Sequence, residues 1–313
     1  MYYTRKKSLF VRIAANKYIY LMMLPGLAAY FCFSYLPLYG MVMAFQNFSI
    51  ADGFFHSEWV GLDNFRDFFT SSDFYMTMKS TFSIGVLRIL FAFPAPILFS
   101  LILNELKEGK FKKVSQTASY LPHFVSWATI GAIVLSFLSV DGGPVNEILM
   151  KLGLIDTSIH FAAKGEAFWP ILIITDIWRE LGWNTIFYLA VIATIDKQLY
   201  ESAMVDGAGK FRQVISITLP SLIPAIAIML ILNIGNIVNA NATDLFNQIM
   251  SMRNDVIREY SDVLDVYVFQ QGLKYGLYSY AAAIGIFKGA VSVAMVFGAN
   301  AMVKKLNKDA SLI

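Results

Sequence analysis

The chain has 313 residues, of which 57% are hydrophobic and only 15% are charged. A soluble domain carries about a quarter charged residues, so this composition excludes an ordinary soluble protein and indicates a membrane protein. The net charge of +3 gives no reason to expect a nucleic-acid partner. With a single cysteine, Cys32, no intrachain disulfide can form.

The first expected elements are a basic segment, residues 1–17, and a long apolar run that begins at Tyr18. The basic segment holds five Lys and Arg residues and no acid. The apolar run continues to about Phe45, well beyond the roughly 7–15 residues of a signal-peptide core. We therefore interpret it as an uncleaved first transmembrane helix.

Six apolar stretches are long enough to cross a membrane, which takes about 20 residues. They cover about residues 18–45, 74–103, 119–139, 167–195, 220–240 and 280–303. Pro122, Pro220 and Pro224 lie near the starts of their spans, where a proline has little effect on a helix. Pro94 and Pro96 fall inside the second span and predict a kink. The expected fold class is all-α, a multi-pass bundle of about six transmembrane helices.

Lys and Arg residues favour one side of these spans. The N-terminus, the loops 104–118 and 196–219 and the C-terminus together carry fifteen, whereas the three longer loops on the other side carry six. The positive-inside rule then predicts that both termini and the loop 196–219 are cytosolic. The expected organisation is a cytosolic segment 1–17, one transmembrane domain 18–303 and a cytosolic tail 304–313.

One cytosolic stretch, "LYESAMVDGAGKFRQVISITLP", contains a sequence that looks like part of a phosphate-binding loop. The pattern G-x-x-x-x-G-K-[ST] would need a glycine where Met204 stands and a Ser or Thr where Phe211 stands. No strand is expected before it. The stretch is therefore not a nucleotide site.

This stretch instead has the sequence features of two short helices joined by a bend. Residues 197–206 are good helix formers without a breaker, so they predict a short helix. Gly207 can adopt backbone angles that other residues resist, which predicts a sharp bend there. A second short helix is expected between Lys210 and Pro220. Together these elements predict a compact projection from the membrane.

This projection resembles a known signature. The residues that carry the resemblance are Glu201, Ser202, Ala203, Asp206, Gly207, Ala208, Ile217, Leu219 and Pro220. They resemble the EAA motif of ABC importer permeases, E-A-A-x-x-x-G-x9-I-x-L-P, from which only Ser202 departs. The "DGA" at Asp206–Ala208 is typical of sugar permeases.

The resemblance extends over most of the chain. Four further stretches, Trp59–Phe69, Leu121–Trp127, Asp141–Leu149 and Gly182–Ala203, resemble carbohydrate importers of the maltose-type class. Ser261–Phe287 resembles the LplB-like permeases of oligosaccharide and polysaccharide-fragment uptake. The resemblance implies the type I ABC importer permease fold in a bacterial cell membrane.

The resemblance also implies partners. They are a second, similar permease, two cytosolic ATPases, an extracytoplasmic solute-binding protein and a carbohydrate substrate. This chain would bind no cofactor, because ATP and Mg would lie on the ATPases. Glu201, Ala203 and Gly207 would sit in a coupling helix that enters a groove of an ATPase, with Glu201 bonded to a basic or amide group there.

Ionisable residues inside a span are candidates for function. The fourth span contains Asp176, Arg179 and Glu180, and the helical spacing predicts that the two acids flank Arg179 on one face. They form either a polar wall of a sugar pathway or an ion-pair network that fixes packing. Trp178 and Trp183 lie beside them and serve either to stack on a sugar ring or to pack.

The fifth span adds amide candidates. Asn233 and Asn236 share a helix face, to which Asp244 and Asn247 return if the helix continues. An amide both donates and accepts hydrogen bonds, which suits hydroxyl recognition, although polar contacts between helices are the alternative. Arg88 is expected to pair with an acid or with the partner permease, and so is Lys288 in the sixth span.

The sequence leaves two alternatives to an importer permease. An autonomous secondary carrier or channel would use Asp176, Arg179, Glu180 and Lys288 as a proton or ion relay. A membrane-embedded enzyme is the third reading, and no catalytic residue is found for it. The three histidines fall in separate segments without metal-ligand spacing, and neither G-x-S-x-G nor H-E-x-x-H occurs.

Overall fold

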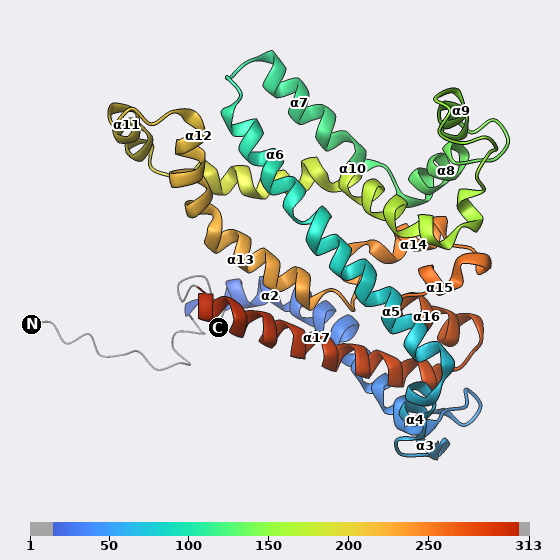
Figure 1. The fold of residues 1–313 in the computed structure, drawn as a ribbon. Helices are drawn as coiled ribbons and strands as arrows, with labels where there is room; N and C mark the ends of the chain where they lie inside the picture. The colour runs from blue at the N-terminus through green and yellow to red at the C-terminus, as the bar shows by residue number, and fades with distance from the viewer. Residues whose placement is uncertain (1–14, 307–313) are drawn as a thin grey trace, which may run out of the picture.

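The computed structural model describes residues 15–306. These residues form a bundle of long helices with shorter helices at both ends and one small antiparallel sheet (Figure 1). The predicted basic residues Arg5, Lys6, Lys7, Arg12 and Lys308 lie outside the described residues.

The helices and strands follow one another with short π- and 3-10 segments between them. In chain order they are α2 (Lys17–Tyr30), β1 (Gln46–Asn47), α3 (Gly53–His56), β2 (Glu58–Trp59), α4 (Asp63–Thr70), α5 (Ser72–Leu87), α6 (Pro94–Glu105), α7 (Lys110–Tyr120), α8 (Trp127–Phe137), α9 (Pro144–Lys151), α10 (Gly165–Ile192), α11 (Lys197–Val205), α12 (Lys210–Gln213), α13 (Leu219–Gly235), α14 (Leu245–Met252), α15 (Arg258–Ser261), α16 (Leu264–Phe269) and α17 (Tyr278–Leu306).

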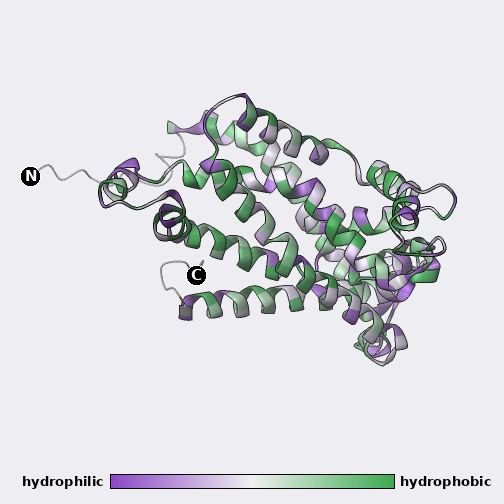
Figure 2. Ribbon diagram, turned by 45° about the horizontal axis from the view of Figure 1, so that its top comes forward, coloured by the Kyte–Doolittle hydropathy of each residue, from purple (hydrophilic) through white to green (hydrophobic). Residues whose placement is uncertain are grey.

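The predicted helical membrane class is confirmed. Four continuous helical segments are long and apolar enough to cross a membrane, namely Lys17–Phe45, Ser72–Glu105, Lys210–Gly235 and Tyr278–Lys305. The α7–α8 pair makes a fifth if it is counted as one bent span. α10 matches the fourth predicted span and has 28 residues, but it is more polar because it carries four ionisable residues. Figure 2 shows apolar residues along the long helices and polar residues gathered at the loops.

The third predicted span, 119–139, is not one straight helix. The helix that begins at Lys110 ends in a 3-10 turn at Leu121–Phe124, and α8 then starts at an angle of 98° to it. Val125 is extended at the break. The Ser126 side chain then caps the new helix by accepting a hydrogen bond from the backbone N–H of Thr129 at 3.2 Å. The chain therefore turns between Pro122, in the 3-10 turn, and Ser126, which caps the next helix.

The fifth span also differs from its prediction. It was expected over 220–240 after a separate short helix, but one continuous helical segment runs from Lys210 to Gly235. A π-turn at Val214–Thr218 comes directly before Pro220, and a second π-turn at Arg88–Ala92 comes directly before Pro94. A wider turn accommodates a proline that cannot donate its backbone hydrogen bond, which is how both helices continue.

The short helices α3, α4, α9 and α15 lie at one end of the bundle (Figure 1). Asp262 is fully buried there and contacts Arg253 at 3.0 Å and Arg258 at 3.1 Å. Burial raises the pKa of the Asp262 carboxyl, and the two arginines oppose that rise. Arg258 also reaches Asp73 in the first turn of α5 at 2.7 Å, which ties this layer to a membrane helix.

Gly182 allows α7 to lie against α10. A Cβ atom at Gly182 would overlap the backbone of Ser119 in α7, so no larger residue fits without moving one helix. Glycine is used here for close approach rather than for an unusual backbone angle. This contact places the bend between α7 and α8 beside the middle of α10.

We expect Gly182→Ala to lower the stability of the folded chain by about 1–3 kcal/mol, because overpacking forces the backbones apart. The measurement is the thermal unfolding midpoint of the purified transporter in detergent. Gly298→Ala in α17 is the matched control, since a Cβ atom there would meet nothing within 4 Å. Equal midpoints for the two variants would contradict the close contact.

Candidate functional site

The first candidate site is the loop 196–220, which we call the handle. The expected helix over 197–206 is present as α11, and Asp196 caps it by accepting a hydrogen bond from the backbone of Gln198 at 2.9 Å. Gly207 has a φ of +76°, so the predicted bend at this glycine is confirmed. In Figure 1 the handle projects from one end of the bundle.

The handle presents apolar side chains that nothing in the described chain covers. Val205 is 89% exposed and Phe211 is 79% exposed, and Leu199 and Met204 are also exposed. Glu201 is exposed on the same short helix. Large apolar side chains on a projecting element mark an interaction surface, because water disfavours their exposure.

The two halves of the sequence motif meet in space. A groove of 310 Å³ lies in the handle and is lined by Ala203, Asp206, Gly207, Ala208, Arg212, Gln213, Ser216 and Ile217. Ser202, the departure from the motif, is exposed and donates a hydrogen bond to the Gln198 carbonyl at 2.8 Å. The serine therefore bonds within its own helix and leaves the groove unchanged.

The base of the handle is fixed to the bundle. The Tyr200 hydroxyl lies 2.9 Å from the hydroxyl of the buried Thr218, and Lys210 pairs with Glu105 of α6 at 3.2 Å. Leu219 and Pro220 then begin α13. These contacts hold the handle against the membrane helices that flank it.

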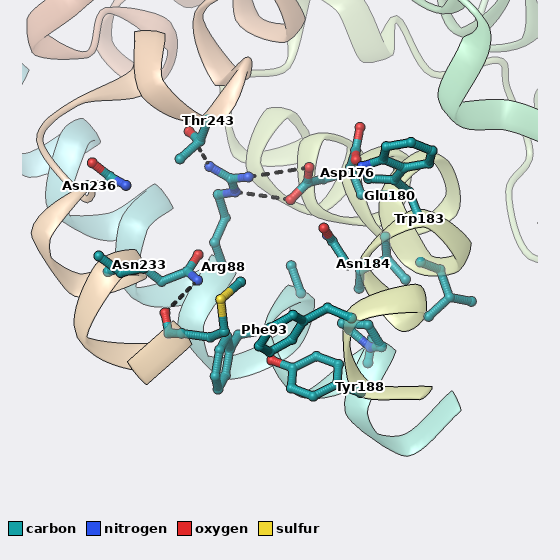
Figure 3. A pocket seen from close by; sticks show the side chains of 18 of the residues that line it. Arg88, Phe93, Asp176, Glu180, Trp183, Asn184, Tyr188, Asn233, Asn236 and Thr243 are labelled. Carbon is teal, nitrogen blue, oxygen red and sulfur yellow. Dashed lines mark hydrogen bonds and ion pairs between the residues drawn. The ribbon is translucent and has the colours of Figure 1, made fainter. Parts of the chain in front are cut away.

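The second candidate site is a cavity of 420 Å³ inside the bundle (Figure 3). Five of the seven predicted pathway residues line it: Asp176, Glu180, Trp183, Asn233 and Asn236. Trp178 and Arg179 do not line it. The lining residues that the sequence interpretation did not propose as pathway contacts include Arg88, Phe93, Asn184, Phe187, Tyr188 and Thr243.

The α10 side of the cavity follows one helix face. Asp176, Glu180, Asn184 and Phe187 are spaced by three or four residues, which places them in a row. The same spacing could have identified Asn184 as a cavity residue from the sequence alone. Thr243 could not be identified in this way, because it comes from the 3-10 turn Ala240–Thr243 after the fifth span and reaches the cavity only through the fold.

Arg88 joins three elements at the cavity. Its guanidinium contacts the carboxylate of Asp176 with Nε at 2.9 Å, and its Nη1 donates to the Thr243 hydroxyl at 2.8 Å (Figure 3). Asp176 is 3% exposed. The expectation that Arg88 pairs with an acid is confirmed. The acid is Asp176, which the sequence analysis had grouped with Arg179.

Arg179 lies behind the cavity wall. It pairs with Glu180 and with Asp244, the latter at 3.3 Å, and its guanidinium lies 4.6 Å from the centre of the Trp127 ring. Asp176, which the sequence placed on the same helix face as Arg179, pairs with Arg88 from the second span. The contacts of Arg179 are those of a residue that fixes packing.

The amides of Asn233 on α13 and of Asn236 just after it occupy the opposite side of the cavity. Asn233 donates a hydrogen bond to the Met229 carbonyl of its own helix at 2.8 Å, which leaves its oxygen toward other partners. The helix ends at Gly235, so Asp244 and Asn247 do not continue the Asn233 face as the sequence suggested. Asp244 instead has a φ of +59° and turns toward Arg179.

Lys288 belongs to a separate network. It pairs with Asp265 and lies 3.4 Å from Asn239, and it does not line the cavity. The four residues that a proton relay would use are therefore divided between two sites. Within residues 15–306, no cluster of three or more His, Cys, Asp and Glu side chains could hold a metal ion.

A bundle of membrane helices with a polar internal cavity and a projecting, apolar handle defines a transport subunit. The chain belongs to the family of binding-protein-dependent transport system inner membrane components, which matches residues 85–246. It is the permease subunit of an ABC importer and not an enzyme, and it lies in the membrane.

Two curated relatives come from Bacillus subtilis (strain 168). Protein LplB is 41% identical over 94% of this chain and 91% of its own length. The polygalacturonan/rhamnogalacturonan transport system permease protein YteP is also 41% identical, over 97% of this chain and 93% of its own length.

The fold is similar to that of a solved transporter. The crystal structure of a bacterial ABC transporter involved in the import of the acidic polysaccharide alginate has a chain with a TM-score of 0.86 and 35% identity. The match covers 96% of this chain and 99% of that chain.

We expect Asp176→Ala to destabilise the protein by about 3–5 kcal/mol, because it leaves the Arg88 guanidinium without its acid inside the bundle. The thermal unfolding of the purified transporter in detergent measures this effect. Asn233→Ala should change stability by less than about 1 kcal/mol, since Asn233 bonds only within its own helix in the described structure. The double variant Arg88→Met, Asp176→Leu should recover much of the loss, and no recovery would contradict an effect of the unpaired charge.

Proposed function

We propose that this chain forms half of the translocation pathway for oligosaccharides or fragments of polysaccharides. The observation that carries the proposal is the internal cavity, whose lining combines amides, hydroxyls and aromatic rings. Such groups suit a ligand with many hydroxyls and apolar ring faces. The names of relatives agree with this class, since they include polygalacturonan, rhamnogalacturonan and arabinooligosaccharides.

The importer that we propose contains three further kinds of component. A second homologous permease completes the pathway, two ATPases bind from the cytosol, and a solute-binding protein delivers the sugar. A solved alginate transporter with the same fold was crystallised with an alginate pentasaccharide-bound periplasmic protein, which supports the last of these. ATP and Mg bind to the ATPases in this assembly.

The handle is the proposed contact with an ATPase. Its exposed apolar side chains and Glu201 suit a partner groove with an apolar floor and a basic or amide group. Closure of the ATPases around ATP would draw the handles together and change which side of the membrane the cavity opens to. The positive φ of Gly207 turns the chain at the end of α11.

The proposed orientation places the handle and both chain termini in the cytosol. The start of α2 and the end of α17 lie at the same end of the bundle as the handle (Figure 1). Lys and Arg residues are concentrated in the loops at this end, as the positive-inside rule requires of a cytosolic face. The opposite end, with α3, α4 and α9, would meet the binding protein.

We expect Glu201→Lys and Gly207→Val to leave membrane insertion intact and to uncouple ATP hydrolysis from sugar uptake. Lysine reverses the charge offered to the ATPase, and valine cannot adopt the positive φ of Gly207 without about 1–2 kcal/mol of strain. The measurement is sugar uptake and ATP hydrolysis by the complete importer in proteoliposomes.

The matched controls for the handle lie on the same loop. Gly209→Val should be tolerated, since Gly209 has a φ of −67° and a Cβ atom there meets nothing within 4 Å. Lys197→Glu tests a charge reversal at the first residue of α11. Normal uptake by both Glu201→Lys and Gly207→Val would sink the proposal that the handle couples to an ATPase.

Orientation has its own test. In a Cys32→Ser background, we expect Thr157→Cys to react with a membrane-impermeant maleimide in intact cells. Gln198→Cys on α11 should react only after the membrane is permeabilised. Both positions are exposed, so the side of the membrane on which each lies is the variable that differs. Labelling of Gln198→Cys in intact cells would reverse the proposed orientation.

A further inference from the structure

The two tryptophans beside the ion pairs of α10 have different surroundings. Trp183 lines the internal cavity and is 43% exposed, whereas Trp178 is 53% exposed and does not line it. The two residues are five positions apart, which separates them by about 140° around the helix. Only Trp183 is therefore available to a solute inside the cavity.

One face of the Trp183 indole is already covered. The imidazole of His123 stacks on it with the ring centres 4.3 Å apart and the planes inclined by 3°. The ring of Phe124 meets the indole edge-on at 5.9 Å and 82°. A third planar or ring-shaped group can therefore stack only on the opposite indole face.

His123 is itself held in place. Its Nδ1 lies 3.0 Å from a carboxylate oxygen of Glu180, and because a carboxylate only accepts, Nδ1–H is the donor. Glu180 also pairs with Arg179, whose Nε donates to the Val125 carbonyl at 3.1 Å. These contacts connect α10 to the break between α7 and α8, and they fix the imidazole plane on which the indole rests.

The arrangement suits a sugar ring. The C–H groups on one face of a pyranose carry partial positive charge and are attracted to the negative face of an aromatic ring. Hydroxyls at the ring edge need donors and acceptors nearby, and Asn184 follows Trp183 directly on the same side of the cavity (Figure 3). A platform whose orientation is preset binds with less loss of conformational entropy.

We propose that Trp183 is the stacking platform for one sugar ring in the translocation pathway and that His123 is the positioning residue that sets the plane of its indole. This assignment rests on the proposed import of oligosaccharides. It makes the bend between α7 and α8 part of the substrate site, because the bend carries His123 to α10.

The test uses the complete importer in proteoliposomes, with its ATPases, partner permease and binding protein. Three labelled probes are offered separately: a galacturonan trisaccharide, a rhamnogalacturonan tetrasaccharide and arabinotriose. The readout is the number of sugars imported per ATP hydrolysed, together with ATP hydrolysis stimulated by the loaded binding protein. A defect in folding or assembly lowers both rates, whereas loss of a sugar contact lowers the ratio.

We expect Trp183→Ala to lower the ratio roughly two- to tenfold, as expected from the loss of one aromatic contact, with stimulated ATP hydrolysis retained. Trp183→Phe should restore part of it. Trp178→Ala is the matched control and should keep the wild-type ratio. His123→Phe keeps a flat ring against the indole and should retain most of the ratio, whereas His123→Gln keeps a hydrogen-bond donor without a ring and should not.

The outcomes separate the two proposals. Import of none of the three probes by the wild-type importer overturns the proposed oligosaccharide function. Import with an unchanged ratio in Trp183→Ala overturns the stacking platform while leaving that function intact. Equal ratios in His123→Phe and His123→Gln overturn the positioning role of the imidazole ring.

Discussion

The constraint on which this structure depends is that a charge inside a membrane bundle must be paired. α10 carries Asp176, Arg179 and Glu180 in its middle, and each is matched by a group from another element. Arg88 comes from the second span to Asp176, and Asp244 comes from the loop after the fifth span to Arg179. An unpaired charge there would cost several kcal/mol, so these pairs fix how the helices and the loop 240–244 are assembled around the cavity.

The handle and the cavity are mechanically connected. α10 forms one wall of the cavity and leads into α11, and α13 forms the opposite wall and begins where the handle ends. The hydrogen bond between Tyr200 and Thr218 closes the base of the handle. The handle therefore adjoins both helices that carry the polar side chains of the cavity. This connection needs no chain of intermediates, because the same helices belong to both sites.

Backbone irregularities give the bundle its shape. π-turns come directly before Pro94 and before Pro220, so the helices continue through prolines that would otherwise interrupt them. A proline followed by an extended residue and a capping serine breaks the third span instead. Proline is thus accommodated in the second and fifth spans but lies at a break in the third. The break brings His123 to α10, and Gly182 allows the approach.

The sequence by itself determined the membrane class, most of the long helices, the short helix α11 and the bend at Gly207, because these follow from local hydrophobicity and backbone preference. It also marked Asp176, Glu180, Trp183, Asn233 and Asn236, since polar residues in apolar spans stand out. Only the tertiary structure decided that Arg88 pairs with Asp176, that Trp178 lies outside the cavity and that Thr243 and His123 reach α10. Those pairings join residues far apart in the chain, and helical periodicity relates only neighbours on one helix.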